Sequence, residues 1–172
     1  MTTVEQTLTG ERADILETLR AHRFFLRNTA RDLTDEQAAT RSTVSELTIG
    51  GLIKHVTITE ASWYDFVVDG PKQGEPTEDD YREHALGFQM LEGETLQVLL
   101  DRYEEVANRT DELVATLPDL DLSHPLPPAP WFAPGATRSA RRVFMHIVAE
   151  TAQHAGHADI IREAIDGAKT MG

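Results

Sequence analysis

The sequence contains no cysteine, and this absence limits what the protein can do on its own. Without cysteine the chain forms no disulfide and offers no thiolate ligand, so any metal site must be built from nitrogen and oxygen donors. For the same reason, any thiol chemistry must use the sulfur atom of another molecule.

Long apolar runs and dense basic clusters are also lacking. No stretch approaches the length needed to span a bilayer, and the first residues lack the basic start and apolar stretch of a signal peptide. We therefore expect a cytoplasmic protein with no membrane partner. The formal net charge is −13, whereas nucleic-acid binding needs basic surface, so we also expect no nucleic-acid partner.

The densest basic group is formed by Arg138, Arg141 and Arg142, at the start of the last predicted helix. These side chains could contact a substrate anion, although a solvated basic turn is the simpler interpretation. The general acidity of the chain is interpreted as a contribution to solubility.

Helical periodicity dominates what the chain does contain, and no segment shows convincing strand alternation. The pattern predicts helices over residues 9–30, 49–68, 95–117 and 139–166. Four long helices in 172 residues predict an all-α fold, an antiparallel four-helix bundle with long connecting loops. This length suits one domain spanning residues 1–172.

Capping residues mark the predicted helix ends. Thr9, Thr48 and Ser139 are the expected N-caps, and Gly70 and Gly167 follow the expected last residues of two helices.

The connections between the helices carry signals of their own. Thr34 begins a short helical turn, and residues 79–85 form another. The proline-dense stretch 118–136 cannot be a helix or a central strand. It is a candidate lid, in which Trp131 and Phe132 either close over one end of the bundle or simply anchor a long loop.

The stretch "ETAQHAGHAD" places Glu150, His154 and His157 within roughly 60° of one another on the last helix, beside its apolar face. A carboxylate is rarely buried without a partner, and a metal ion would be one. A solvated polar face, or a pair between Glu150 and Arg142, would also explain the pattern. Both interpretations stay open on this helix alone.

A third ligand would have to come from another helix, and His55 lies on the inward strip of the second one. With Glu150 and His154 it makes a set of two histidines and one carboxylate. That set suits Zn²⁺ with an open fourth position, and also Fe²⁺ or Ni²⁺. Alone, His55 would be a structural histidine. The remaining histidines are interpreted as surface or loop residues: His22, His84 and His124.

Four segments together resemble the DinB-like four-helix-bundle superfamily: "LTIGGLIKHVTITEASWYDF", "VFMHIVAETAQHAGHADIIREAIDG", "LTDEQA" and "GETLQVLLDRY". The resemblance is strongest to its mini-circle protein branch, which is similar to mycothiol-dependent maleylpyruvate isomerases; the wider group includes mycothiol and bacillithiol S-transferases. Many members bind metal through three histidines. Here Glu150 replaces one of them, as in the isomerase-like branch, so the resemblance implies a divalent metal, usually zinc, at His55, Glu150 and His154.

The resemblance implies a metal-dependent transferase that joins a mycothiol-type thiol to an electrophilic small molecule, as in detoxification. The alternatives are a metal-activated-water hydrolase on the same site and a non-enzymatic, stress-related ligand-binding bundle. His157 is the candidate catalytic residue, as an acid or base, although it could also be a fourth ligand, an outer partner of the site or a hydrogen-bonded bundle histidine. His146 leaves the same choices. The apolar helix surface is compatible with a homodimer.

Overall fold

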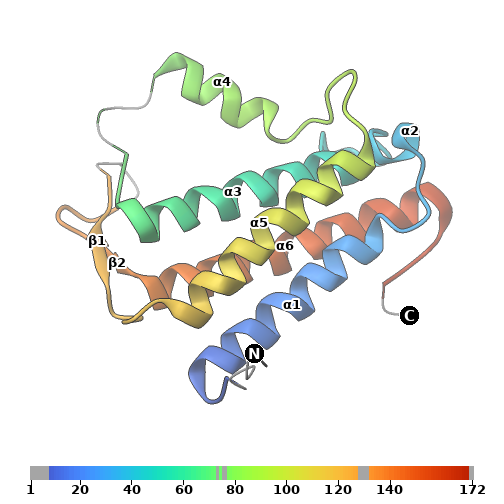
Figure 1. Ribbon diagram of the computed structural model, residues 1–172. Helices are drawn as coiled ribbons and strands as arrows, with labels where there is room; N and C mark the ends of the chain where they lie inside the picture. The colour runs from blue at the N-terminus through green and yellow to red at the C-terminus, as the bar shows by residue number, and fades with distance from the viewer. Residues whose placement is uncertain (1–7, 73, 75–76, 128–131, 171–172) are drawn as a thin grey trace.

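Four long helices lie side by side, and two short helices and a small hairpin occupy the connections between them (Figure 1). The computed structural model describes residues 8–72, 74, 77–127 and 132–170. Within them, no helix is long and apolar enough to cross a membrane. The elements are α1 (Glu11–Thr29), α2 (Asp35–Ala38), α3 (Ile49–Asp69), α4 (Glu78–Leu86), α5 (Leu96–Thr116), β1 (Ser123–Pro125), β2 (Thr137–Ser139) and α6 (Ala140–Asp166).

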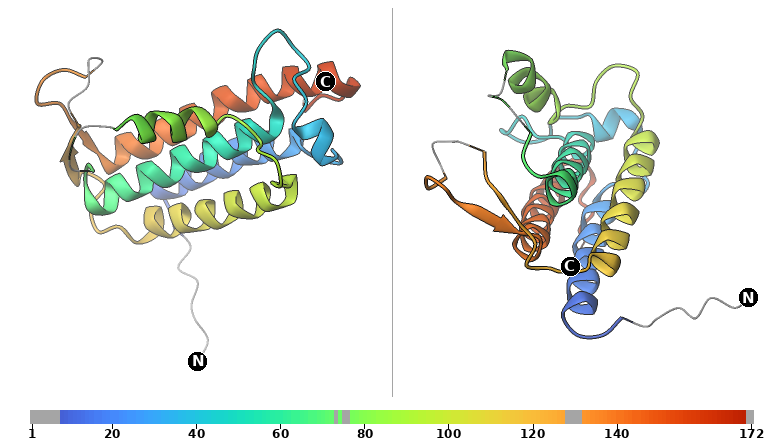
Figure 2. Two further views of the ribbon diagram at one scale, coloured as in Figure 1. Left: turned by 90° about the horizontal axis from the view of Figure 1, so that it is seen from above. Right: turned by 60° about the vertical axis from the view of Figure 1, so that its left-hand side comes forward.

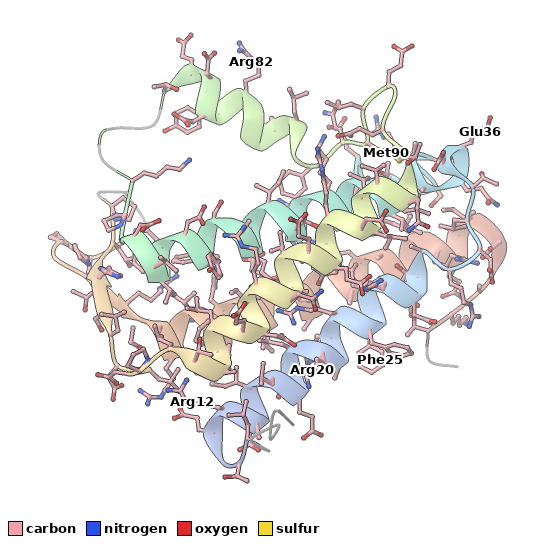
Figure 3. All side chains as sticks on the ribbon, in the orientation of Figure 1. Arg12, Arg20, Phe25, Glu36, Arg82 and Met90 are labelled. Carbon is pink, nitrogen blue, oxygen red and sulfur yellow. The ribbon has the colours of Figure 1, made fainter. Side chains whose placement is uncertain are left out.

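Each long helix packs mainly against two others: α1 against α6 and α5, and α3 against α5 and α6 (Figure 2). A smaller contact joins α1 to α3. Arg12, near the start of α1 (Figure 3), donates to the carbonyls of Val114 and Leu117 at the end of α5, so α1 and α5 are antiparallel. Arg162, near the end of α6, donates to the carbonyl of Thr29 at the end of α1, so these two helices run parallel. The expected all-α bundle with long connecting loops is confirmed.

The directions of the helices follow from the length of one connection. Residues 70–95 carry the chain back to the end at which α3 began, so that α5 runs parallel to α3 (Figure 1). Short loops would have given antiparallel neighbours throughout. Antiparallel packing holds for α3 with α6 and for α1 with α5.

Most predicted helix ends are confirmed. Thr48 and Ser139 are N-caps whose hydroxyls accept a backbone N–H from the first turn, and Gly167 ends α6 with a φ of 78°. The prediction for Thr9 is wrong. The N-cap of α1 is Gly10, whose φ of 66° suits glycine, and no side chain caps this helix.

The connections also hold the one type of element that the sequence did not reveal. Thr34 begins α2 with a capping box, as expected, and α4 covers the second expected turn. However, β1, within the proline-dense stretch, pairs in an antiparallel hairpin with β2, which directly follows that stretch. Strands of three residues are too short to show alternation, and Pro125 is tolerated because a two-stranded sheet has only edge strands.

A polar layer divides the apolar core into two clusters. In each long helix, charged or hydroxyl side chains lie between the residues of one cluster and those of the other. Arg23 forms the centre of the layer: its Nε lies 3.3 Å from Glu60 Oε2, and its Nη1 lies 2.6 Å from Asp111 Oδ1. Glu60 is only 1% exposed, so its charge depends on this partner.

Candidate metal centre

The three predicted ligands come together between α3 and α6. One donor atom from each of His55, Glu150 and His154 lies within 4.8 Å of the other two. Both histidines are buried, and the Glu150 side chain is 28% exposed. The three donors meet because α3, which carries His55, is an antiparallel neighbour of α6. On α6, a spacing of four residues puts Glu150 and His154 one turn apart on the same face.

The donor set fits a divalent cation of the zinc type. Zinc bonds to nitrogen and oxygen are about 2.0–2.2 Å long, so donors that share one ion lie roughly 3.3–4.2 Å apart. The distance from Glu150 Oε2 to His154 Nε2 is 3.5 Å, which already suits a shared ion. His55 brings the second nitrogen donor within a small side-chain adjustment of that range.

The charge of Glu150 also favours a cation at this place. Within the described ranges, the basic groups at ion-pair distance from this carboxylate are the imidazoles of His146 and His154. The alternative pairing with Arg142 does not occur there. Burial lowers the pKa of His154, with Glu150 acting in the opposite direction, so the ring is mainly neutral at pH 7. A neutral ring offers a lone pair to a metal but does not neutralise Glu150.

His157 lies beside a candidate ligand and outside the three-residue set. Its Nδ1 is 3.4 Å from Nδ1 of His154, the ring nitrogen opposite to the one near Glu150. An outer partner that orients a metal-binding ring would occupy such a position.

His146 lies on the other side of Glu150, one turn earlier in α6. Its Nε2 is 3.6 Å from Glu150 Oε1, and its ring packs edge-on against Trp63, with centroids 5.0 Å apart. Burial lowers the pKa of His146; Glu150 opposes this effect, and Arg138 and Arg142 add to it.

Phe88 covers the site, and the sequence did not predict it. The ring of Phe88 stacks on His55 with a centroid distance of 3.8 Å and an interplanar angle of 18°. The available signal was the pair Gly50-Gly51 at the start of α3. A Cβ on Gly51 would overlap the carbonyl oxygen of Phe88, and one on Gly50 would lie 2.7 Å from Met90 Sδ.

Lys54 fixes the segment that carries Phe88. Its ammonium group donates to the carbonyl of Gln89 at 3.2 Å and to Glu94 Oε2 at 2.9 Å. The same carboxylate accepts the backbone N–H of Leu91 at 2.7 Å. The segment 88–94 is therefore held on α3 from both ends.

Replacing Gly51 with alanine should displace this segment. The new methyl group overlaps backbone that Lys54 holds in place, which we expect to cost about 1–3 kcal/mol of unfolding free energy, partly offset by better helix propensity. Gly156→Ala is the matched control, because a Cβ there meets nothing within 4 Å, and it should stabilise by up to about 1 kcal/mol. Urea unfolding measures both. Equal stabilisation by the two variants would contradict the close contact.

The other aromatic residues and histidines named in the sequence analysis do not belong to the three-residue set. Trp131 lies outside the described residues, and Phe132 lies with its ring 5.5 Å from the Arg138 guanidinium. His22 and His124 lie away from the site, as expected; His124 Nε2 is 3.1 Å from the carbonyl oxygen of Val67. The side chain of His84 is outside the described part of the structure.

Comparison with known proteins agrees with this geometry. Residues 14–167 match the mycothiol-S-transferase family. Among solved structures, the conserved protein of locus from Enterococcus faecalis is similar in fold, with a TM-score of 0.64 and 16% sequence identity, over 94% of this chain and 100% of that chain. No curated protein matches the chain. The match over most of its length shows that the chain belongs to the mycothiol S-transferase family of DinB-like proteins.

Proposed function

We propose that the protein is a metal-dependent S-transferase that joins mycothiol, or a similar small thiol, to an electrophilic small molecule. The observation that carries the proposal is the gathering of His55, Glu150 and His154 within 4.8 Å. Two nitrogen donors and one carboxylate suit zinc, with nickel and iron as the other candidates. Family membership supports the thiol as the co-substrate.

The absence of cysteine assigns the reacting sulfur to that co-substrate. A bound divalent cation would supply one effect, which is to favour the thiolate form of the thiol. The thiolate is the nucleophile; it forms a bond to an electrophilic carbon, from which a leaving group departs with its electron pair.

The chain's own residues hold the donors in place. If His157 Nδ1 accepts the Nδ1–H of His154, the lone pair on His154 Nε2 points toward Glu150 and the shared ion. Phe88 covers His55 and reduces the access of water on that side. We therefore assign His157 a positioning role next to the metal.

The test uses protein purified without a histidine tag and loaded separately with zinc, nickel or iron. Mycothiol and monochlorobimane are added, and the thioether product is followed by fluorescence and mass spectrometry. We expect metal-dependent conjugation with release of chloride. Turnover of hydrolysable substrates without any thiol would support the hydrolase instead. A protein that retains metal but converts nothing would support the ligand-binding alternative.

A further inference from the structure

Arg138 and Arg142 place two positive charges where the hairpin meets the last helix: Arg138 lies in β2, and Arg142 lies in the first turn of α6. Within the described ranges, no carboxylate lies at ion-pair distance from either guanidinium group. Arg141, between them in the sequence, differs because it pairs with both Glu11 and Asp121. Arg12 and Arg102 also lack such a carboxylate within these ranges, but Arg12 donates to carbonyls of α5. Arg138 and Arg142, by contrast, lie near enough to each other that the pKa of Arg138, lowered by burial, is lowered further by the charge of Arg142.

The Arg138 guanidinium is held between aromatic rings. It lies 4.8 Å from the centre of the Trp63 ring and 5.5 Å from that of Phe132, at distances typical of cation–π contacts. Burial lowers the pKa of Arg138, and Arg142 lowers it further. The group therefore carries an uncompensated positive charge in a defined position, unlike a solvated basic turn.

The two arginines lead toward the candidate metal centre. Arg142, His146, Glu150 and His154 follow one another at intervals of four residues, and therefore form a continuous strip on α6. Trp63 joins Arg138 to this strip, because its ring contacts both Arg138 and His146. At a rise of 1.5 Å per residue, the backbones of Arg142 and Glu150 are about 12 Å apart.

We propose that Arg138 and Arg142 form an anion subsite that binds a substrate carboxylate at one end of this strip, while the reacting atoms lie at the His55, Glu150 and His154 end. Guanidinium groups bind carboxylates through paired, charge-assisted hydrogen bonds. The inference rests on the proposed function, and it adds a substrate class: molecules with a carboxylate separated by a spacer from the reacting group. The carboxylate belongs either to the electrophile or to the thiol.

Two matched electrophiles test the first source. 6-(Chloroacetamido)hexanoate carries a terminal carboxylate, and 6-(chloroacetamido)hexanamide replaces it with a neutral amide. In both, the mycothiol sulfur bonds to the chlorine-bearing carbon, and chloride leaves with the electron pair. The wild-type protein should prefer the acid in kcat/KM by about tenfold, the effect of one charge-assisted contact of roughly 1.4 kcal/mol.

The variants Arg138→Gln and Arg142→Gln should bring this preference close to one. Arg142→Gln is included because Arg138 also packs against rings, and its loss could disturb the fold. Arg102→Gln, an exposed arginine on α5, should keep the wild-type preference. The proposal would be overturned if both test variants kept the wild-type preference for the acid with the electrophile pair and also with the pair of thiols compared below.

A second pair tests the thiol as the source of the carboxylate. Glutathione and its diethyl ester are compared with the neutral chloroacetamide as electrophile. A preference for the free acid that both arginine variants remove would assign the carboxylate to the thiol. Loss of preference only in the first pair would assign it to the electrophile.

Anion binding is also measured without catalysis. This measurement tests the anion subsite even if the proposed transferase function fails. In a Trp131→Phe background, Trp63 is the sole tryptophan, and it contacts Arg138. Titration with 6-acetamidohexanoate should change its fluorescence saturably, and Arg142→Gln should weaken this binding by about tenfold. If the protein turns over nothing, a saturable response still supports the subsite. No response in wild-type protein and no acid preference would overturn it.

Discussion

Replacing His154 with alanine should remove the divalent cation from the candidate centre and abolish metal-dependent thiol transfer. The substitution deletes one of three donors and leaves His55 and Glu150 too few to hold the ion. Losing an outer partner of a metal ligand typically lowers affinity about 10–100-fold, so the loss of a ligand itself should exceed roughly 100-fold. Elemental analysis after dialysis measures the loss.

Two control variants are measured in the same way. His22→Ala changes a histidine on α1 outside the candidate set and should leave the metal content unchanged. His157→Ala should weaken binding by about 10–100-fold without abolishing it, if His157 orients the ring of His154. Full metal occupancy in His154→Ala would show that other residues bind the ion.

The pH dependence of metal retention follows from the same histidine. Burial holds the pKa of His154 below its ordinary value of 6.5, so the ring stays neutral down to mildly acidic pH. A proton competes with the metal for this ring only when the pH falls through the lowered pKa. The wild-type protein should therefore keep its metal at pH 7 and release it as the solution becomes more acidic.

Replacing Arg23 with methionine should strongly destabilise the fold, because Glu60 would lose the partner of its buried charge. Removing one member of a buried ion pair typically costs about 3–5 kcal/mol. The expected loss of unfolding free energy is measured by urea denaturation at pH 7. The double variant Arg23→Met/Glu60→Gln should recover much of it, since the amide carries no charge.

Arg20→Met is the matched control for this prediction. Arg20 also pairs with Asp111, at 2.9 Å, but its side chain is 65% exposed. Exposed pairs of this kind contribute roughly 0–1 kcal/mol. If Arg23→Met and Arg20→Met had equally small effects, the polar layer would not depend on the buried pair.

The helices and the candidate ligands could be predicted from the sequence because their signals are local. Thr48 and Ser139 cap helices through contacts within one turn. The spacing of Glu150 and His154 places them on one face of a helix in any fold. His55 needed one further inference, that its strip faces inward, and the structure confirms that it lies beside the other two.

The rest depends on contacts between distant segments, which periodicity does not encode. Phe88 covers His55 because Lys54 holds a segment far along the chain, and only the Gly50-Gly51 pair indicated a close approach. Arg23 and Glu60 lie at core positions as charged residues, so neither can be recognised as buried until its partner is known. The contact between the Trp63 ring and Arg138 likewise joins two distant segments, α3 and β2.

Lys54 attaches residues 88–94 to α3, so the candidate metal centre does not depend on the part of the connection that precedes them. The helix α4 stands above α3, apart from the main bundle (Figure 1). Phe88 belongs to the segment that Lys54 holds directly on α3. We therefore expect that residues 71–86 can change in length or sequence with little effect on the three candidate ligands. This stretch is therefore a place at which a peptide or a small domain can be inserted by design.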